Sequence, residues 1–181
     1  MELPFSNPRR EAARLLLIEP NRSAMGVMAR RLNEVGYRVA AAESAEKGIA
    51  ELYRLPVDLV LAELALPGRS GTELTRMIRD DSSLRDVPVI LIAGRSDSGG
   101  AIRALAAGAD DIVAKPFDHD LLIARIERLL ARGRAMRELR ADNASLDARV
   151  VRRAIELGEM RQALKDSEGA LQRLSAMVGR N

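Results

Sequence analysis

Short apolar runs alternate with longer amphipathic stretches along the first 130 residues. The runs are continuously apolar, as in parallel strands buried on both faces, and fall at 14–18, 37–41, 59–62, 87–92 and 112–113. Between them, apolar residues recur every three or four positions and predict helices at 23–35, 44–55, 72–80 and 98–107, with a long helix from 118. Five strands alternating with five helices predict a doubly wound α/β domain with a five-stranded parallel sheet.

Individual residues set some of these boundaries. Ser44 is expected to cap the second helix, and Gly36 is expected to end the first. Within the second helix, the spacing of Ile49, Leu52 and Tyr53 predicts that these three side chains face the core.

The helical pattern continues beyond residue 132. Thirteen positions follow one another at spacings of three and four, and ten of them are apolar. This heptad repeat predicts a left-handed coiled coil between two copies of the chain, because a single helix with one long apolar stripe would leave that stripe in water. The predicted seam consists of Met136, Leu139, Asn143, Leu146, Val150, Arg153, Leu157, Met160, Leu164, Ser167, Leu171, Leu174 and Val178.

Polar residues in and beside the seam indicate its geometry. Asn143 occupies a core position where a pair of amides favours a parallel, two-stranded register, and Glu156 can reach Arg161 of the other copy. Asp142 and Asp147 would form a like-charged pair, which weakens the coil. The alternative is a helix that packs back on its own domain.

Composition and charge narrow the classes of function. The chain has no Cys and one His, which excludes disulfides and thiolate metal sites and disfavours a histidine metal site. No apolar run approaches the ~18 residues of a membrane span, so a cytoplasmic location is expected. Residues 131–181 hold 11 Lys and Arg against 7 Asp and Glu, whereas residues 1–130 hold 18 against 19. Because the basic excess lies in the extension, nucleic-acid binding by the globular part is not indicated.

Three segments follow from these patterns. Residues 1–13 are polar and predict a disordered tail, residues 14–132 form the α/β domain, and residues 133–181 form the coiled-coil helix. Within the domain, a carboxylate at Glu63 ends the third apolar run, and Pro67 and Gly71 follow in a loop. Since sites in open α/β sheets lie at the carboxyl ends of the strands, Glu63 is the first candidate functional residue.

Four short motifs stand at the ends of the predicted strands, in the order Leu15–Ile18, Leu66-Pro67 with Gly71 downstream, Gly108–Asp111 and Ala114–Phe117. With these motifs, residues 14–132 resemble the receiver domain of two-component response regulators. The resemblance implies a flavodoxin-like fold. The part from 108 to 132 looks most like receivers of dimeric transcription factors and of cyclic-di-GMP enzymes.

The resemblance also implies a phosphorylation site, in which an Asp accepts the phosphoryl group, two acids help to bind Mg²⁺, and a Ser or Thr and a Lys hold the phosphoryl oxygens. Only the lysine is retained here. The matching positions are the acceptor at Glu63, the acidic pair at Glu19 and Pro20, the metal-binding carbonyl at Ala65, the switch positions at Ala93 and Ile112, and the lysine at Lys115.

These substitutions have chemical consequences. Mg²⁺ prefers an octahedron of oxygen ligands, and Pro20 removes one carboxylate. The extra methylene of Glu63 displaces its carboxylate by over ~1 Å, which disfavours in-line attack. Ala93 has no hydroxyl to bind a phosphoryl oxygen. We therefore expect that the domain is not an enzyme, that the phosphorelay chemistry is lost, that Mg²⁺ binding is weak or absent, and that no other cofactor is bound.

Two interpretations of Glu63 remain open. Its carboxylate could extend toward Lys115 and imitate a phosphoryl group, or it could form a structural ion pair with Lys115 that holds the strand ends together. A single charge is a poor imitation of a phosphoryl group, which carries a charge close to −2.

The expected function is phosphorylation-independent signalling by a degenerate receiver that forms a parallel homodimer through residues 136–178. Its expected partners are a histidine kinase or a downstream effector protein, with residues 98–132 as a second contact surface. The alternative is a phosphorylatable receiver that regulates a larger cyclic-di-GMP enzyme or a DNA-binding regulator. Within the extension, the runs Asp142–Arg149 and Leu171–Ser175 are also similar to linkers that join receivers to HD-GYP phosphodiesterases.

Overall fold

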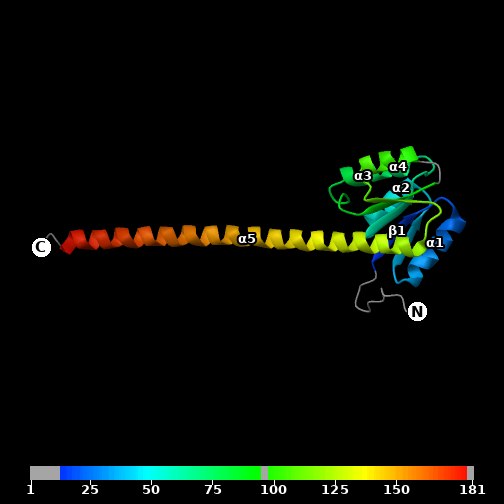
Figure 1. Ribbon diagram of the computed structural model, residues 1–181. Helices are drawn as coiled ribbons and strands as arrows, with labels where there is room; N and C mark the ends of the chain where they lie inside the picture. Colours follow the sequence, from blue (N-terminus) through cyan, green and yellow to red (C-terminus); the bar gives the residue numbers. More distant parts are fainter. Residues whose placement is uncertain (1–12, 95–97, 179–181) are drawn as a thin grey trace. The chain divides into compact units, whose positions relative to one another are not determined.

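Five parallel strands form the sheet that the alternating pattern predicted. The computed structural model describes residues 13–94 and 98–178, and the chain divides after Arg134 into two units, described separately below. The elements are β1 (Arg14–Ile18), α1 (Arg22–Glu34), β2 (Arg38–Ala42), α2 (Ala45–Arg54), β3 (Leu59–Glu63), α3 (Gly71–Asp80), β4 (Val89–Ala93), α4 (Ser98–Ala106), β5 (Asp111–Ala114) and α5 (His119–Val178) (Figure 1). The predicted tail lies outside the described residues except for Ala13.

The strand order of the sheet is β2-β1-β3-β4-β5, and each neighbouring pair is parallel. This is the order of flavodoxin-like folds, so the predicted fold class is confirmed. The direction of winding reverses between β1 and β3, which pair with Ile18 opposite Ala62. The residues that follow these two strands therefore emerge side by side at the carboxyl edge.

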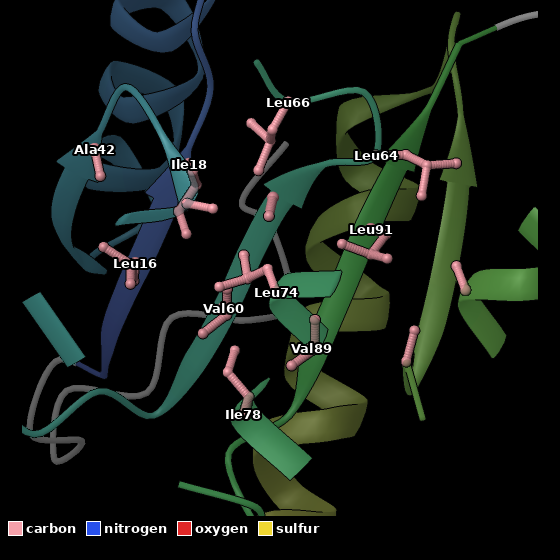
Figure 2. Packing of buried hydrophobic residues seen from close by; sticks show 14 of the residues in the cluster. Leu16, Ile18, Ala42, Val60, Leu64, Leu66, Leu74, Ile78, Val89 and Leu91 are labelled. Atoms are coloured by element: carbon pink, nitrogen blue, oxygen red, sulfur yellow. The ribbon is translucent and has the colours of Figure 1, made fainter. Parts of the chain in front are cut away.

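Both faces of the sheet are covered by helices, because successive side chains of a strand point to opposite sides. Leu15 and Leu17 pack with apolar residues of α1 and α5, whereas Leu16 and Ile18 pack with residues of α2, α3 and α4. Figure 2 shows the second cluster, where Leu16 and Ile18 lie with side chains of β3, β4 and α3. The aliphatic interior leaves the carboxyl edge of the sheet as the place for polar groups.

The observed boundaries differ from the predicted ones by one or two residues. The side chain of Asn21 caps α1, which begins at Arg22 rather than at residue 23, and Ser44 caps α2 as predicted. The inward prediction for Tyr53 is wrong, since 64% of its surface is exposed. Its hydroxyl donates a hydrogen bond of 2.5 Å to Asp81, so the polar end of the ring lies outside the core.

Arg79 joins three segments that sequence patterns did not connect. Its guanidinium donates to the backbone carbonyls of Arg85, Val87 and Gly108 at 2.9–3.0 Å, and to Asp110 Oδ2 at 2.7 Å. These bonds tie α3 to the loop before β4 and to the turn between α4 and β5. One side chain thus fixes the loops that lead into two strands of the site.

Replacing Arg79 by Ala is expected to lower the free energy of unfolding by about 2–3 kcal/mol, because four hydrogen bonds are lost and some carbonyls remain shielded from water. Lys should recover only part of the loss, since an ammonium lacks the planar fork of a guanidinium. Urea unfolding checks this, with Arg76→Ala as the control, because Arg76 is exposed on the same helix. Equal losses in the two Ala variants would contradict the assignment.

The second unit consists of the part of α5 from Ala135 onward. Every seam position whose exposure is given is about half exposed or more, from 45% at Met136 to 67% at Val150. The same holds for Leu139, Leu146, Leu157, Met160 and Leu164. The helix continues through Leu171 and Leu174, whose side chains lie outside the described ones. Among the described helices, none is long and apolar enough to cross a membrane.

Candidate functional site at the carboxyl edge of the sheet

Glu63 ends the central strand β3, whose five residues are all buried. Only 9% of its surface is exposed, and Glu19, which directly follows β1, is 7% exposed. The loop after Glu63 turns closely into α3: a Cβ added to Gly71 would lie 2.7 Å from the Glu63 carbonyl oxygen. The glycine that the motif requires is therefore explained by the contact between the start of α3 and the end of β3.

Lys115 connects the two glutamates. It follows β5, and its ammonium donates to Glu63 Oε2 at 2.5 Å and to Glu19 Oε2 at 3.3 Å. The other oxygen of Glu19 accepts a hydrogen bond of 2.9 Å from the backbone N–H of Asn21, at the start of α1. The sequence reasoning placed Lys115 beside Glu63 but missed its bond to Glu19. That bond could have been foreseen from the adjacency of β1 and β3.

The charges in this cluster do not balance, since two carboxylates share one ammonium. Burial raises the pKa of Glu63, and the nearby charge of Glu19 adds to this effect, while Lys115 opposes it without cancelling it. Burial lowers the pKa of Lys115, but the hydrogen bonds and charges of Glu63 and Glu19 outweigh burial and leave that pKa raised. The lysine is thus held in its charged form by both neighbours.

The other positions matched by the resemblance add no polar side chain. Pro20 is partly buried and Ala65 is exposed. Ala93 is buried at the end of β4, and Ile112 of β5 packs against the apolar cluster beneath α2, α3 and α4. A hydroxyl is therefore absent from both switch positions. What the structure brings together is the group of Glu19, Glu63 and Lys115, called the edge triad below.

The edge triad does not fit an octahedral magnesium site. Such a site needs several carboxylate, carbonyl or water oxygens around one ion, and one carboxylate position is occupied by Pro20. Within residues 13–94 and 98–178, no group of three His, Cys, Asp or Glu side chains is placed to hold a metal ion. The Oε2 atoms of Glu19 and Glu63 both accept a hydrogen bond from the Lys115 ammonium.

Lys115→Met is expected to lower the free energy of unfolding at pH 7 by about 1–3 kcal/mol, because it leaves two buried carboxylates without a counter-ion. The value is below that for a fully buried pair, since the Lys115 side chain is 40% exposed. A Glu63 pKa that is raised in the folded state favours folding as pH falls. The loss should therefore shrink between pH 7 and the ordinary Glu value of 4.5.

Urea unfolding at pH 7 and pH 5 measures this effect. The matched control is Lys115→Met combined with Glu63→Gln, which removes one of the two charges and should recover most of the lost stability at pH 7. The single variant Glu63→Gln sets the baseline. Equal losses for Lys115→Met at both pH values, with no recovery in the double variant, would show that the lysine does not neutralise the pair.

Comparison with known proteins relates most of the first unit to one family. Residues 15–127 match the family described as the response regulator receiver domain. The chain is 35% identical over 142 residues to the sensory transduction protein RegX3 of Mycolicibacterium smegmatis, which covers 78% of this chain and 61% of that protein. It is 31% identical over 121 residues to the phosphate regulon transcriptional regulatory protein PhoB of Escherichia coli, covering 67% and 53%.

A longer match is found with the response regulator PleD of Caulobacter vibrioides, at 29% identity over 173 residues, covering 93% of this chain and 38% of that protein. The chain thus spans between 38% and 61% of the length of these three relatives. Two solved structures have a similar fold. A response regulator of Chloroflexus aurantiacus has a TM-score of 0.64 and 26% identity, and the match covers 67% of this chain and 99% of that one. FixJ-N has a TM-score of 0.62 and 28% identity, and the match covers 67% of this chain and 96% of that one.

Proposed function

This chain belongs to the response regulator receiver domain family of two-component systems, and on that premise we propose that it signals without being phosphorylated. The observation that carries the proposal is the Lys115 ammonium, which bridges Glu63 and Glu19 at the position where the family would hold a phosphoryl group and its metal. The receiver is then held in one state by its own side chains. It acts through protein contacts and is not an enzyme.

Three features of the site support the loss of phosphoryl transfer. Glu63 is longer than an Asp, which displaces its carboxylate from the geometry of in-line attack, and its Oε2 already accepts a hydrogen bond from Lys115. Pro20 withholds a metal ligand. Ala93 has no hydroxyl that could bind a phosphoryl oxygen and so draw the loop after β4 toward it. Both interpretations of Glu63 expect its contact with Lys115. We favour the structural ion pair over a phosphoryl mimic, because Ala93 has no hydroxyl that could respond to a mimic and a single charge imitates a phosphoryl group poorly.

Dimerisation through α5 is the second part of the proposal. The seam from Met136 to Leu164 exposes large apolar side chains along one stripe, and a second copy would remove them from water. Asn143 then faces its counterpart across the axis and favours a parallel, two-stranded arrangement. Glu156 of one copy can pair with Arg161 of the other. Val151 and Ile155 are also exposed, lie outside this seam, and are not explained by it.

The partner-binding surface is proposed to be the face formed by α4, β5 and the first turns of α5. It exposes Ile102 at 71%, Leu105 at 53% and Leu121 at 53%. Beside them, Arg125 binds Asp111 through two hydrogen bonds of 2.8 Å, which fixes α5 against β5. A histidine kinase or a downstream effector protein is the proposed partner, in the cytoplasm, and nucleic acid is not.

The test is intact-mass measurement after incubation of the full chain with a small phosphodonor and Mg²⁺. We expect no added phosphoryl group under conditions that phosphorylate an ordinary receiver in a parallel sample. One phosphoryl group per chain, lost on Glu63→Gln, would overturn the proposal. A salt-dependent mobility shift with duplex DNA would overturn the exclusion of nucleic acid as a partner.

A second candidate is a phosphorylatable receiver that regulates a longer enzyme or DNA-binding protein. The match to the response regulator PleD favours it, since that match extends through most of the second unit and covers 38% of the relative. The length of the native open reading frame distinguishes a regulatory segment from a separate protein. The same mass measurement decides whether the receiver accepts a phosphoryl group.

A further inference from the structure

Two large apolar side chains of α5 lie on the side of the helix away from the seam. Val151 is 59% exposed and Ile155 is 58% exposed, and their spacing of four residues places them on one face. With exposed small residues they form a stripe, called the outer face below: Ala144, Ala148, Val151, Ile155 and Gly158. We propose that the outer face binds the outer face of another copy, parallel and in register. The proposal rests on the seam dimer for the unit that associates.

The pattern of the outer face is that of a second heptad stripe. Its members follow one another at spacings of four, three, four and three, as the residues of a coiled-coil seam do. Gly158 is a poor helix former, and a Cβ added to it would meet no atom of this chain within 4 Å. The fold of the single chain therefore does not require a glycine at this position. A neighbouring helix that approaches closely would make use of the missing side chain.

The charges beside the outer face indicate that its occupant is a parallel second copy. Asp147 and Arg152 are exposed and lie on its two edges. They have the same spacing as Glu156 and Arg161, the pair proposed across the seam. Asp147 of one copy therefore lies near Arg152 of the other, and each contact contains this opposite-charge pair twice. In the seam, Asp147 faces Asp142 instead. A neighbour on the outer face thus supplies the opposite charge that Asp147 lacks in the seam dimer.

The contact between outer faces is weaker than the seam, because each helix contributes only two large apolar side chains to it. Stable interfaces bury about 1,200–2,000 Å², and contacts of smaller area are weak and transient. We expect a Kd of about 10⁻⁴ M for this contact, so the chain stays a dimer at low micromolar concentration. Since each dimer carries one outer face on each helix, further dimers can be added on both sides when the concentration rises.

The experiment uses disulfide cross-linking, which is specific here because the natural chain has no cysteine. Ile155→Cys places a thiol in the outer face, Asn143→Cys places one in the seam, and Ser145→Cys is an exposed control on neither face. Each full-length variant is oxidised with copper phenanthroline at about 5 µM and about 300 µM, below and above the expected Kd. Asn143→Cys should cross-link at both concentrations, and Ile155→Cys only at the higher one. Ser145→Cys should cross-link at neither.

A further substitution, Asp147→Lys, separates the two interfaces because it changes them in opposite directions. In the seam the new ammonium faces Asp142 and should tighten the dimer. At the outer face it lies near Arg152, so cross-linking of Ile155→Cys should slow by about three- to tenfold. Lys is a better helix former than Asp, so the helix itself is not weakened.

Two results would overturn the proposal. One is cross-linking of Ile155→Cys that is no faster than that of Ser145→Cys at the higher concentration. The other is a rate for Ile155→Cys that Asp147→Lys leaves unchanged. A failure of the proposed function has a different readout, since Asn143→Cys without a cross-link would contradict the seam but not the contact between outer faces.

Discussion

Leu157→Asp is expected to dissociate the dimer, with a rise in its Kd of about 10³–10⁴-fold. Leu157 occupies a core position of the predicted seam and is 52% exposed in the single chain. Each dimer loses two buried leucines, worth about 1.5–3 kcal/mol apiece, and also places two carboxylates in an apolar layer. A loss of about 4–6 kcal/mol in association corresponds to that change in Kd. Sedimentation equilibrium measures it directly.

The matched control introduces the same residue on the opposite side of the same helix. Ala148 is exposed and lies at an outer heptad position, so Ala148→Asp should change Kd by less than about tenfold through helix propensity alone. If both variants weaken the dimer equally, the seam is misassigned. If neither does, α5 is not the dimer interface.

Restoring the missing groups is expected to produce a phosphorylatable receiver from one that does not react. Pro20→Asp returns a second carboxylate for a metal, Glu63→Asp shortens the acceptor, and Ala93→Thr supplies a hydroxyl. The shorter acceptor also withdraws from the Lys115 ammonium and leaves room for a metal. We expect the mass of the triple variant to rise by one phosphoryl group in most chains after incubation with a phosphodonor and Mg²⁺.

The control for this experiment carries Pro20→Asp and Ala93→Thr with Glu63→Asn, which keeps the size of the acceptor but removes its nucleophilic oxygen. It should gain no mass. If the triple variant stays unmodified although it is folded and binds Mg²⁺, then the three positions do not account for the loss of chemistry. A phosphoryl group on the natural chain would contradict the account more directly.

Much of the fold could be predicted because its signals are local. Continuous apolar runs such as Leu15–Ile18 mark strands buried on both faces, and the alternation of strands and helices leaves few topologies open. Ser44 was recognised as a cap because a side-chain oxygen at that place satisfies a free N–H. Strand ends were less certain: β4 begins at Val89, after Pro88, which has no N–H for the ladder.

The features that were missed depend on residues distant in sequence. Arg79 reaches carbonyls near residues 85–87 and 108, and no periodicity reveals such a contact. Tyr53 was assigned to the core from its spacing, but a hydrogen bond to Asp81 keeps its hydroxyl at the surface. The link between Glu19 and Lys115 spans 96 positions and follows only from the strand order. The residue types at the strand ends could be assigned from the sequence, whereas the contacts between them follow only from the fold.

Glu63 is a single carboxylate at a strand end in the sequence, and in the structure it forms a triad with Glu19 and Lys115. We infer that the triad holds the receiver in one state and that Glu63 is not a catalytic residue. The central claim is that the chain is a dimer whose assembly does not depend on phosphorylation. The claim has two parts, that the edge triad does not accept a phosphoryl group and that the seam of α5 forms a dimer, and one sample can test both.

The most direct measurement is light scattering of the full-length chain with and without a phosphodonor and Mg²⁺, at the same protein concentration. We expect the mass of a dimer in both samples. A monomer without the donor that becomes a dimer with it would contradict the account, because it would show a receiver that still responds to phosphorylation.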